Sequence, residues 1–158
     1  PGGRLALSSC SDYNLYLWDL AAGRQVSAFK GHTDRINSVS VSPDGCYALS
    51  GSEDKTIRLW DLKRGTEVKQ FLGHSASVRT VCFSPDGLYA LSGSNDKSIC
   101  LWEIESGAQI KKAEGHTDLV TTVFVSGDGR YAVSGSADRT LHLWEFDWKW
   151  IFSGQGLG

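Results

Sequence analysis

Histidine, serine and aspartate recur together along this chain, and these residue types could supply the base, the nucleophile and the orienting acid of a hydrolase. A tryptophan accompanies each group, and the complete groups are His32, Ser50, Asp54 and Trp60; His74, Ser92, Asp96 and Trp102; and His116, Ser134, Asp138 and Trp144. Two observations argue against catalysis. An active site is normally built once in a domain, whereas this group recurs, and Ser50 lies inside a predicted strand rather than on a strained turn. We therefore expect no catalytic residue and a protein that is not an enzyme.

The regular spacing of these groups indicates a repeated structural unit. The tryptophan and the aspartate each return every 42 residues, and an incomplete first group keeps Ser8, Asp12 and Trp18 but has no histidine. A period of about 20–50 residues is typical of units that cannot bury their faces alone and that stack on copies of themselves. The 158 residues therefore contain three full periods and part of a fourth.

Residues 31–72 show what one period contains. Alternating apolar and polar residues predict four short strands, over 36–41, 47–51, 56–62 and 67–72. A Ser-Pro-Asp-Gly turn at 42–45 joins the first two, because Pro presets φ and Gly takes a positive φ. The third strand carries apolar side chains on both of its faces, so the predicted sheet is packed on both sides. The period predicts an antiparallel meander that stacks between two neighbouring sheets.

Three motifs recur in a fixed order in the full periods. In residues 31–72 they are Gly31-His32, then Ser42-Pro43-Asp44-Gly45, then Ser50-Gly51-Ser52-Glu53-Asp54-Lys55-Thr56 running on to Leu59-Trp60-Asp61. In motif order, spacing and strand pattern the chain resembles the WD-repeat β-propeller family, over essentially all of its length except the last dozen residues. The resemblance implies an all-β fold, namely a partial β-propeller of WD-repeat type with about four four-stranded antiparallel blades.

The expected organisation is one propeller segment over residues 1–152 and a flexible tail over 153–158. The units of the segment are 1–30, which is partial, then 31–72, 73–114 and 115–152. About four blades would leave two apolar faces uncovered, and such faces are larger than the patches that monomers usually expose. We expect the chain to be part of a longer propeller, and a homo-oligomer that closes a ring of about eight blades is the alternative.

The family resemblance implies a structural role for the repeated polar groups. At these positions it implies a buried hydrogen-bond chain that runs from Asp through His and Ser to the indole N–H of Trp. Buried polar groups must be paired, and a fully satisfied network rigidifies a unique packing. The four-residue groups are therefore expected to stabilise the fold.

Function is expected where the periods differ from one another. The loop after each Gly-His and the loop before each repeated aspartate lie at the same end of the blade by hairpin geometry. The family resemblance identifies that end as the usual partner-binding surface, and loops on a rigid scaffold commonly carry binding. The expected partner-binding residues are Arg35, Asn37, Glu53, Ser77, Arg79, Asn95, Leu119, Thr121 and Ala137. Arg35 and Arg79 are the expected anchors, since Arg is enriched at hot spots; neutral variation on solvated loops is the alternative.

Composition and charge exclude several classes of partner. The net charge is −2 and the charges are interspersed, so no basic stripe favours nucleic acid. Apolar runs are far too short to span a membrane. His142 lies outside the repeated pattern, and no second ligand at suitable spacing accompanies it, so we expect no metal and no cofactor.

The four cysteines fall at different positions of the repeat, which argues against a disulfide framework. Free thiols favour a reducing compartment, so we expect a cytoplasmic protein, with the nucleus as the alternative. The expected function is a non-enzymatic scaffold that binds a protein or peptide through the loops of a WD-repeat propeller. The alternatives are a self-assembling structural segment and the interaction portion of a longer multidomain signalling protein.

Overall fold

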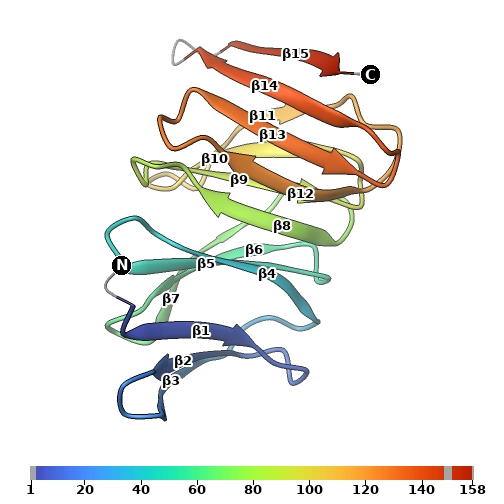
Figure 1. The fold of residues 1–158 in the computed structure, drawn as a ribbon. Coiled ribbons are helices and arrows are strands. Elements are labelled where there is room, and N and C mark those ends of the chain that lie inside the picture. Colours follow the sequence, from blue (N-terminus) through green and yellow to red (C-terminus); the bar gives the residue numbers. More distant parts are fainter. Residues whose placement is uncertain (1–2, 148–150, 158) are drawn as a thin grey trace.

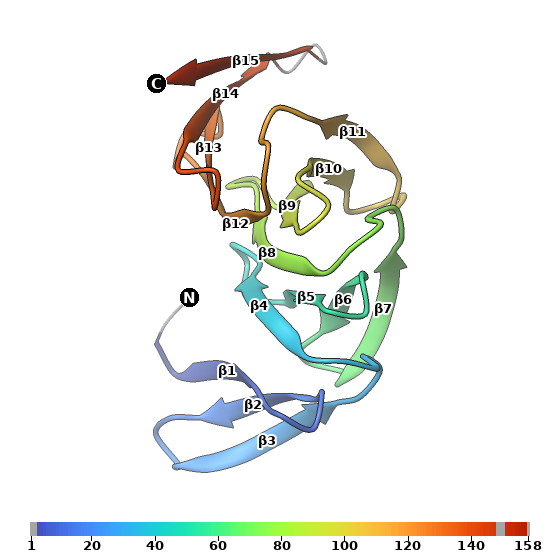
Figure 2. The ribbon, with the colours of Figure 1, turned by 90° about the vertical axis from the view of Figure 1, so that its right-hand side faces the viewer.

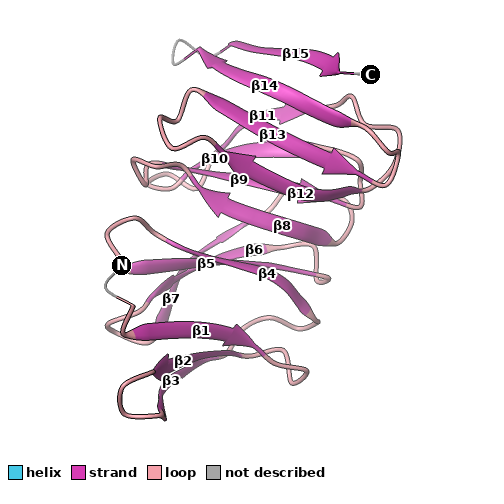
Figure 3. Ribbon diagram, in the orientation of Figure 1, coloured by secondary structure: helices cyan, strands magenta, loops and turns pink. Residues whose placement is uncertain are grey.

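All regular elements of the computed structural model are strands, and it describes residues 3–147 and 151–157. Figure 3 shows no helix in this part of the chain. The first sheet has three strands, β1 (Leu5–Ser9), β2 (Leu15–Asp19) and β3 (Arg24–Phe29). The second sheet has four, β4 (Ile36–Val41), β5 (Tyr47–Ser52), β6 (Ile57–Asp61) and β7 (Thr66–Phe71).

The other two sheets repeat the second. The third sheet contains β8 (Val78–Phe83), β9 (Tyr89–Ser94), β10 (Ile99–Glu103) and β11 (Gln109–Ala113). The fourth contains β12 (Val120–Val125), β13 (Tyr131–Ser136), β14 (Leu141–Asp147) and β15 (Ile151–Leu157). Within each sheet, neighbours in sequence pair antiparallel, so each sheet is a meander. We call them sheets 1 to 4 in chain order.

The hairpin turns follow from their Ser, Asp and Gly residues. Ser42 Oγ donates to Asp44 Oδ1 over 2.5 Å, and Tyr47 N donates to Ser42 Oγ over 2.9 Å. Gly45 closes the turn with a φ of 73°, a region that favours glycine. The same hydrogen bonds recur in sheets 3 and 4. The turn between the first and second strands is therefore closed in the same way in each full sheet.

The sheets stack face to face, from β1–β3 at one end of the molecule to β12–β15 at the other (Figure 1). Three apolar clusters fill the three interfaces. The cluster between sheets 2 and 3 includes Leu49, Ile57, Val81 and Trp102, and its counterparts hold the same positions of the repeat. Both faces of sheets 2 and 3 are therefore buried, which explains why their strands carry apolar residues on both sides.

The first strands of the full sheets also contact one another through polar groups. In Figure 2, β4, β8 and β12 follow one another along one side of the stack. Val81 N donates to Ser38 Oγ over 3.2 Å, and Val123 N donates to Thr80 Oγ1 over 3.3 Å. Each first strand thus supplies a hydroxyl to the edge amide of the next, and this fixes the stagger between sheets.

The expected fold class is confirmed: four antiparallel sheets stacked in the manner of a partial WD-repeat propeller. Sheet 1 has no strand in the place that β4, β8 and β12 occupy in the other sheets.

The C-terminal segment differs from the flexible tail expected over 153–158. Residues Ile151–Leu157 form β15, in which Ile151 pairs with Asp147 and Leu157 with Leu141. The pairing supplies hydrogen-bond partners to the backbone of both strands. This gain outweighs the low strand propensity of the glycines in the segment. Pro1, Gly2 and Gly158 lie outside the described residues.

Candidate functional site

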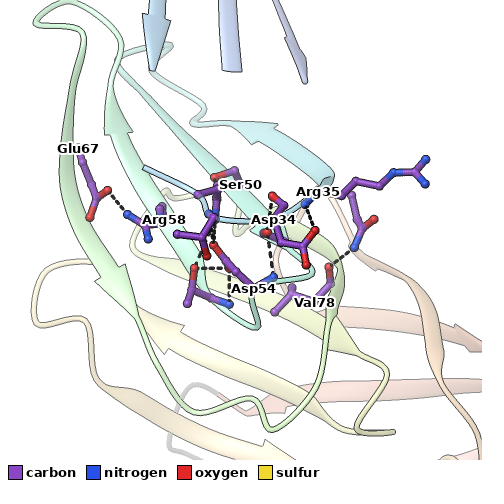
Figure 4. A network of polar contacts seen from close by, with 12 residues as sticks. Asp34, Arg35, Ser50, Asp54, Arg58, Glu67 and Val78 are labelled. Atoms are coloured by element: carbon purple, nitrogen blue, oxygen red, sulfur yellow. Dashed lines mark hydrogen bonds and ion pairs between the residues drawn. The ribbon is translucent and has the colours of Figure 1, made fainter. Parts of the chain in front are cut away.

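The repeated polar group of sheet 2 forms one continuous hydrogen-bond chain, part of which appears in Figure 4. Asp54 Oδ2 lies 2.7 Å from His32 Nδ1, and His32 Nε2 lies 2.6 Å from Ser50 Oγ. Trp60 Nε1 donates to the same Ser50 Oγ over 2.8 Å. A carboxylate only accepts, so Nδ1 of His32 carries the proton, and Nε2 accepts from the Ser50 hydroxyl. A neutral histidine therefore satisfies every member of the chain.

Sheets 3 and 4 contain the same chain at nearly the same distances. His74 lies 2.8 Å from both Asp96 and Ser92, and His116 lies 2.9 Å from Asp138 and 2.8 Å from Ser134. The indoles of Trp102 and Trp144 donate to the two serines over 2.8 Å. The three tryptophans are 1%, 1% and 4% exposed in chain order, so the chains lie in the closed interior between sheets.

Burial and hydrogen bonding set the protonation of these chains. Desolvation lowers the pKa of His32 and of His74 below 6.5, and the neighbouring aspartates oppose this only in part. Burial by itself raises the pKa of Asp96, but hydrogen bonds from Ser98 and His74 outweigh it and lower the pKa to about 2. Near neutral pH the chains of sheets 2 and 3 thus pair a neutral imidazole with an ionised carboxylate.

The same burial excludes the hydrolase interpretation of these residues. Ser50, Ser92 and Ser134 have no exposed surface, and each hydroxyl is held between an imidazole and an indole. A nucleophile must reach the substrate, and these hydroxyls cannot. Each of the three groups instead joins the strands and loops of its own sheet.

Sheet 1 builds a different version of the chain, one that sequence reasoning missed. It has no histidine, and the hydroxyl of Tyr16 donates to Asp12 Oδ2 over 2.5 Å instead. Trp18 Nε1 still donates to Ser8 Oγ, over 2.9 Å, yet Trp18 is 37% exposed. The two halves of the chain are therefore no longer connected. The signal was available, since tyrosine is the residue that precedes the repeated tryptophan by two.

The position two residues before the repeated tryptophan contacts the histidine in sheets 3 and 4, and in sheet 2 it carries an arginine that forms an ion pair. Arg58 pairs with Glu67 over 2.5 Å beside the chain of sheet 2 (Figure 4), and Cys100 Sγ lies 3.9 Å from His74 Nδ1. His142 stacks on His116 with ring centroids 4.1 Å apart, and desolvation lowers its pKa. His142 is thus a half-buried residue of strand β14. In the described residues, no three His, Cys, Asp or Glu side chains are grouped so as to hold a metal ion.

The nine expected partner-binding residues lie at one end of the sheets, which we call the loop end. Backbone hydrogen bonds join their loops in pairs: Glu53 N donates to Arg35 O over 2.8 Å, Asn95 N to Ser77 O over 2.9 Å, and Ala137 N to Leu119 O over 3.0 Å. The hairpin argument from sequence is thus correct about their placement. Arg35 is exposed and extends away from the buried chain in Figure 4.

The remaining three positions of the loop end share a feature that the sequence did not reveal. Asn37, Arg79 and Thr121 each sit at a β-bulge in the first strand of a sheet, between the paired residues on either side. A bulge turns a side chain out of the regular alternation of the strand. These positions vary among the repeats because their side chains point away from the alternating core pattern.

Other properties of the described residues bear on partners and location. No helix in them is long and apolar enough to cross a membrane. All four cysteines are free, and Cys10 and Cys46 are exposed.

The chain is similar to known repeat proteins. A stretch of 43 residues is 44% identical to guanine nucleotide-binding protein subunit beta-5b of Danio rerio, covering 27% of this chain and 11% of that protein. A stretch of 45 residues is 42% identical to Protein groucho of Drosophila melanogaster, covering 28% of this chain and 6% of that protein. The chain therefore spans only a small part of these relatives.

A family comparison covers more of the sequence. The WD40 family, described as WD domain, G-beta repeat, matches residues 23–61, 65–103 and 107–145. Each match contains one buried tryptophan, and the three matches together exceed half of the chain. The motifs, the stacked antiparallel sheets and these matches agree, and the chain belongs to the WD40-repeat family.

Proposed function

We propose that this protein is a non-enzymatic scaffold that binds a protein or peptide at the loop end of sheets 2, 3 and 4. The observation that carries the proposal is the placement of the nine variable residues at one end of the sheets. Six of them lie on loops that backbone hydrogen bonds join in pairs, and three lie at bulges of the adjoining strands. WD40 repeats are a protein-interaction type of scaffold, which supports the same function. The buried serines and histidines support the absence of catalysis by these groups.

The two arginines of the loop end are the expected anchors of binding. In the described part of the chain neither guanidinium has a hydrogen-bond or ion-pair partner, so both are available to a ligand. Arg is enriched at binding hot spots because it combines charge, a planar group and several donors.

Display selection of peptides on the immobilised protein, followed by substitution, tests the proposal. Arg35→Glu combined with Arg79→Glu should abolish binding of the selected peptides and leave the free energy of unfolding within about 0.5 kcal/mol, since surface substitutions rarely cost more. Lys63→Glu combined with Arg130→Glu reverses two charges at the opposite turns and should keep binding. Peptides that bind the loop-end variant and the native protein equally would place the binding surface elsewhere.

Exposed apolar faces favour a second function, assembly with further repeats. Phe124 and Leu141 of sheet 4 are 68% and 56% exposed, whereas the equivalent Cys82 and Ile99 of sheet 3 pack against sheet 4. A second copy of this chain or the remainder of a longer propeller would cover this face. Sedimentation at increasing concentration tests the second copy: association that Phe124→Glu abolishes supports it, and a stable monomer rejects it.

We also propose a cytoplasmic location, with the nucleus as the alternative, on the basis of the four free thiols. A role as the interaction portion of a longer signalling protein is supported by the relatives, of which the chain covers only a small share. Fluorescent tagging of the parent protein, with fractionation, tests the location; secretion would reject it.

A further inference from the structure

The three bulge residues of the loop end differ in whether their polar groups are already used. Asn37 Nδ2 donates to Val78 O over 3.0 Å and to Ser77 Oγ over 3.3 Å. Its amide donor is therefore already hydrogen-bonded to the neighbouring sheet. Thr121 Oγ1 donates to Gly135 O over 3.0 Å. Arg79 is half-buried, and its guanidinium makes no hydrogen bond or ion pair within the described residues. Of the three, Arg79 alone keeps its donors free for a ligand.

The charges around Arg79 are unlike those of the flanking sheets. Sheets 2 and 4 carry carboxylates at the loop end: Asp34 and Glu53 are half-buried, and Asp118 is exposed. The loop end of sheet 3, formed by residues 75–77 and 95–97 and the first residues of β8, contains Asp96 as its only carboxylate, and the Asp96 side chain is 4% exposed. Hydrogen bonds from His74, Ser75 and Ser98 saturate that carboxylate. The half-buried Arg79 and the exposed Lys97 therefore have no accessible counter-charge from their own sheet.

An unsatisfied acceptor lies in the same loops. Asn95 Oδ1 is enclosed and has no hydrogen-bond partner, although Asn95 N donates to Ser77 O, two residues from Arg79. Enclosed acceptors are almost always paired, so an unpaired one marks a position where a donor is missing. If the side-chain amide turns outward on binding, the N–H of a bound peptide supplies the missing donor.

We propose that the loop end of sheet 3 recognises the side-chain carboxylate of an Asp or Glu residue in an extended peptide. Arg79 binds the carboxylate through two parallel N–H donors, Lys97 adds attraction, and Asn95 accepts an adjacent peptide N–H. Bidentate guanidinium–carboxylate pairs are short, directional and stronger than neutral hydrogen bonds. This inference rests on the proposed binding function of the loop end and adds the chemical class of the residue recognised.

The test uses the peptides that the display selection yields. Most should share one Asp or Glu position. Replacing that residue by Gln or Asn, or replacing Arg79 by Gln in the protein, should weaken binding about ten-fold or more, as expected for a charge-assisted pair. Arg139→Gln removes an exposed arginine at the same end of sheet 4 and should change affinity less than about two-fold. A phosphoserine at the acidic position distinguishes a carboxylate from a phosphate site, and tighter binding of phosphoserine would overturn the proposal.

The outcomes separate this inference from the proposed function. Selected peptides that have no shared acidic position, and that bind the Arg79→Gln protein as well as the native one, would overturn the carboxylate site. The proposed function would survive that result if the double arginine-to-glutamate variant still lost binding. Retention of binding by the double variant would reject both.

Discussion

Sheets 1 and 3 carry the same serine, aspartate and tryptophan at the same spacing, yet they bury them to very different extents. In sheet 3 the indole of Trp102 is 1% exposed and connects through Ser92 and His74 to Asp96. In sheet 1, Trp18 is 37% exposed and its hydrogen bond ends at the serine. The tryptophan–serine bond forms within one hairpin in both sheets, since the partners are ten residues apart.

The difference shows which hydrogen bond of the polar network forms between residues close in sequence and which needs a residue from outside the hairpin. The histidine reaches its serine from 18 residues earlier in sequence, ahead of the first strand of the sheet. Sheet 1 contains the local bond and no histidine partner, and the face of its tryptophan is open to solvent. Stacking, rather than the motif by itself, therefore makes the group a buried network.

The largest expected contrast is between the two tryptophans. Trp102→Ala should lower the free energy of unfolding by about 3–5 kcal/mol, because it leaves a large cavity between sheets 2 and 3. Trp18→Ala should cost roughly 1–2 kcal/mol, since part of its surface is already solvated. Urea denaturation followed by circular dichroism measures both. Equal losses would contradict the view that stacking, rather than the motif, makes the tryptophan stabilising.

The aspartates of the two sheets allow the same comparison for the hydrogen bonds at the aspartate end of the network. Asp96→Ala should cost about 1–3 kcal/mol, because His74, Ser75 N and Ser98 lose a buried charged acceptor. Asp12→Ala in sheet 1 should cost less, since Asp12 is exposed. Asp96→Asn keeps the shape and isolates the charge. An unchanged melting temperature for Asp96→Ala would reject a stabilising role for the network.

Acidification should increase the difference in stability between sheets 1 and 3. The pKa of His74 is lower in the folded state than the ordinary 6.5, so the unfolded state binds the proton more readily. Stability is therefore complete above about pH 6.5 and falls as the pH drops below that value. The lowered pKa of Asp96 adds a second loss as the pH falls from 3.8 towards about 2. Both shifts act in the same direction.

Native-state hydrogen exchange, corrected for the intrinsic rate, can resolve this loss by sheet. Between pH 7 and pH 5, amide protection in sheet 3 should fall more than in sheet 1, which has no histidine. His74→Asn should remove most of the pH dependence in sheet 3. Protection that changes equally in both sheets would show that the histidine chains do not govern the acid response.

Much of this architecture could be predicted from the sequence because its causes are local and repeated. The alternation of residues 36–41 and the Ser-Pro-Asp-Gly turn at 42–45 are properties of short segments, and they recur. The bulges at Asn37, Arg79 and Thr121 were not predicted, since they depend on register between two strands. β15 was also missed: its glycines favour a loop, and only pairing with β14 makes the segment a strand.

The candidate site divides in the same way. The placement of Arg35 beside Glu53 follows from hairpin geometry, which the sequence contains. Asn37 donates its amide hydrogen to Val78 of the next sheet, whereas the donors of Arg79 are not used. This difference depends on the distance between neighbouring sheets. Repeats identify the variable positions, but only the packed structure distinguishes the variable residues that are already bonded from those that are not.

The smallest expected effect tests the hydrogen bond between Tyr16 and Asp12 in sheet 1. Tyr16→Phe removes the hydroxyl that donates to Asp12, and no other change in the hairpin is expected. Because the pair is solvated, the loss of stability should be smaller than for Asp96→Ala, and amide protection should fall in β1 and β2 but not in sheet 3. The hydroxyl bond also raises the pKa of Tyr16, so an ordinary value in an ultraviolet titration would show that the bond is absent in solution. If the bond is present, a tyrosine of the same strand pair donates to the aspartate of sheet 1, whereas in the other three sheets the histidine is the neighbour of the aspartate.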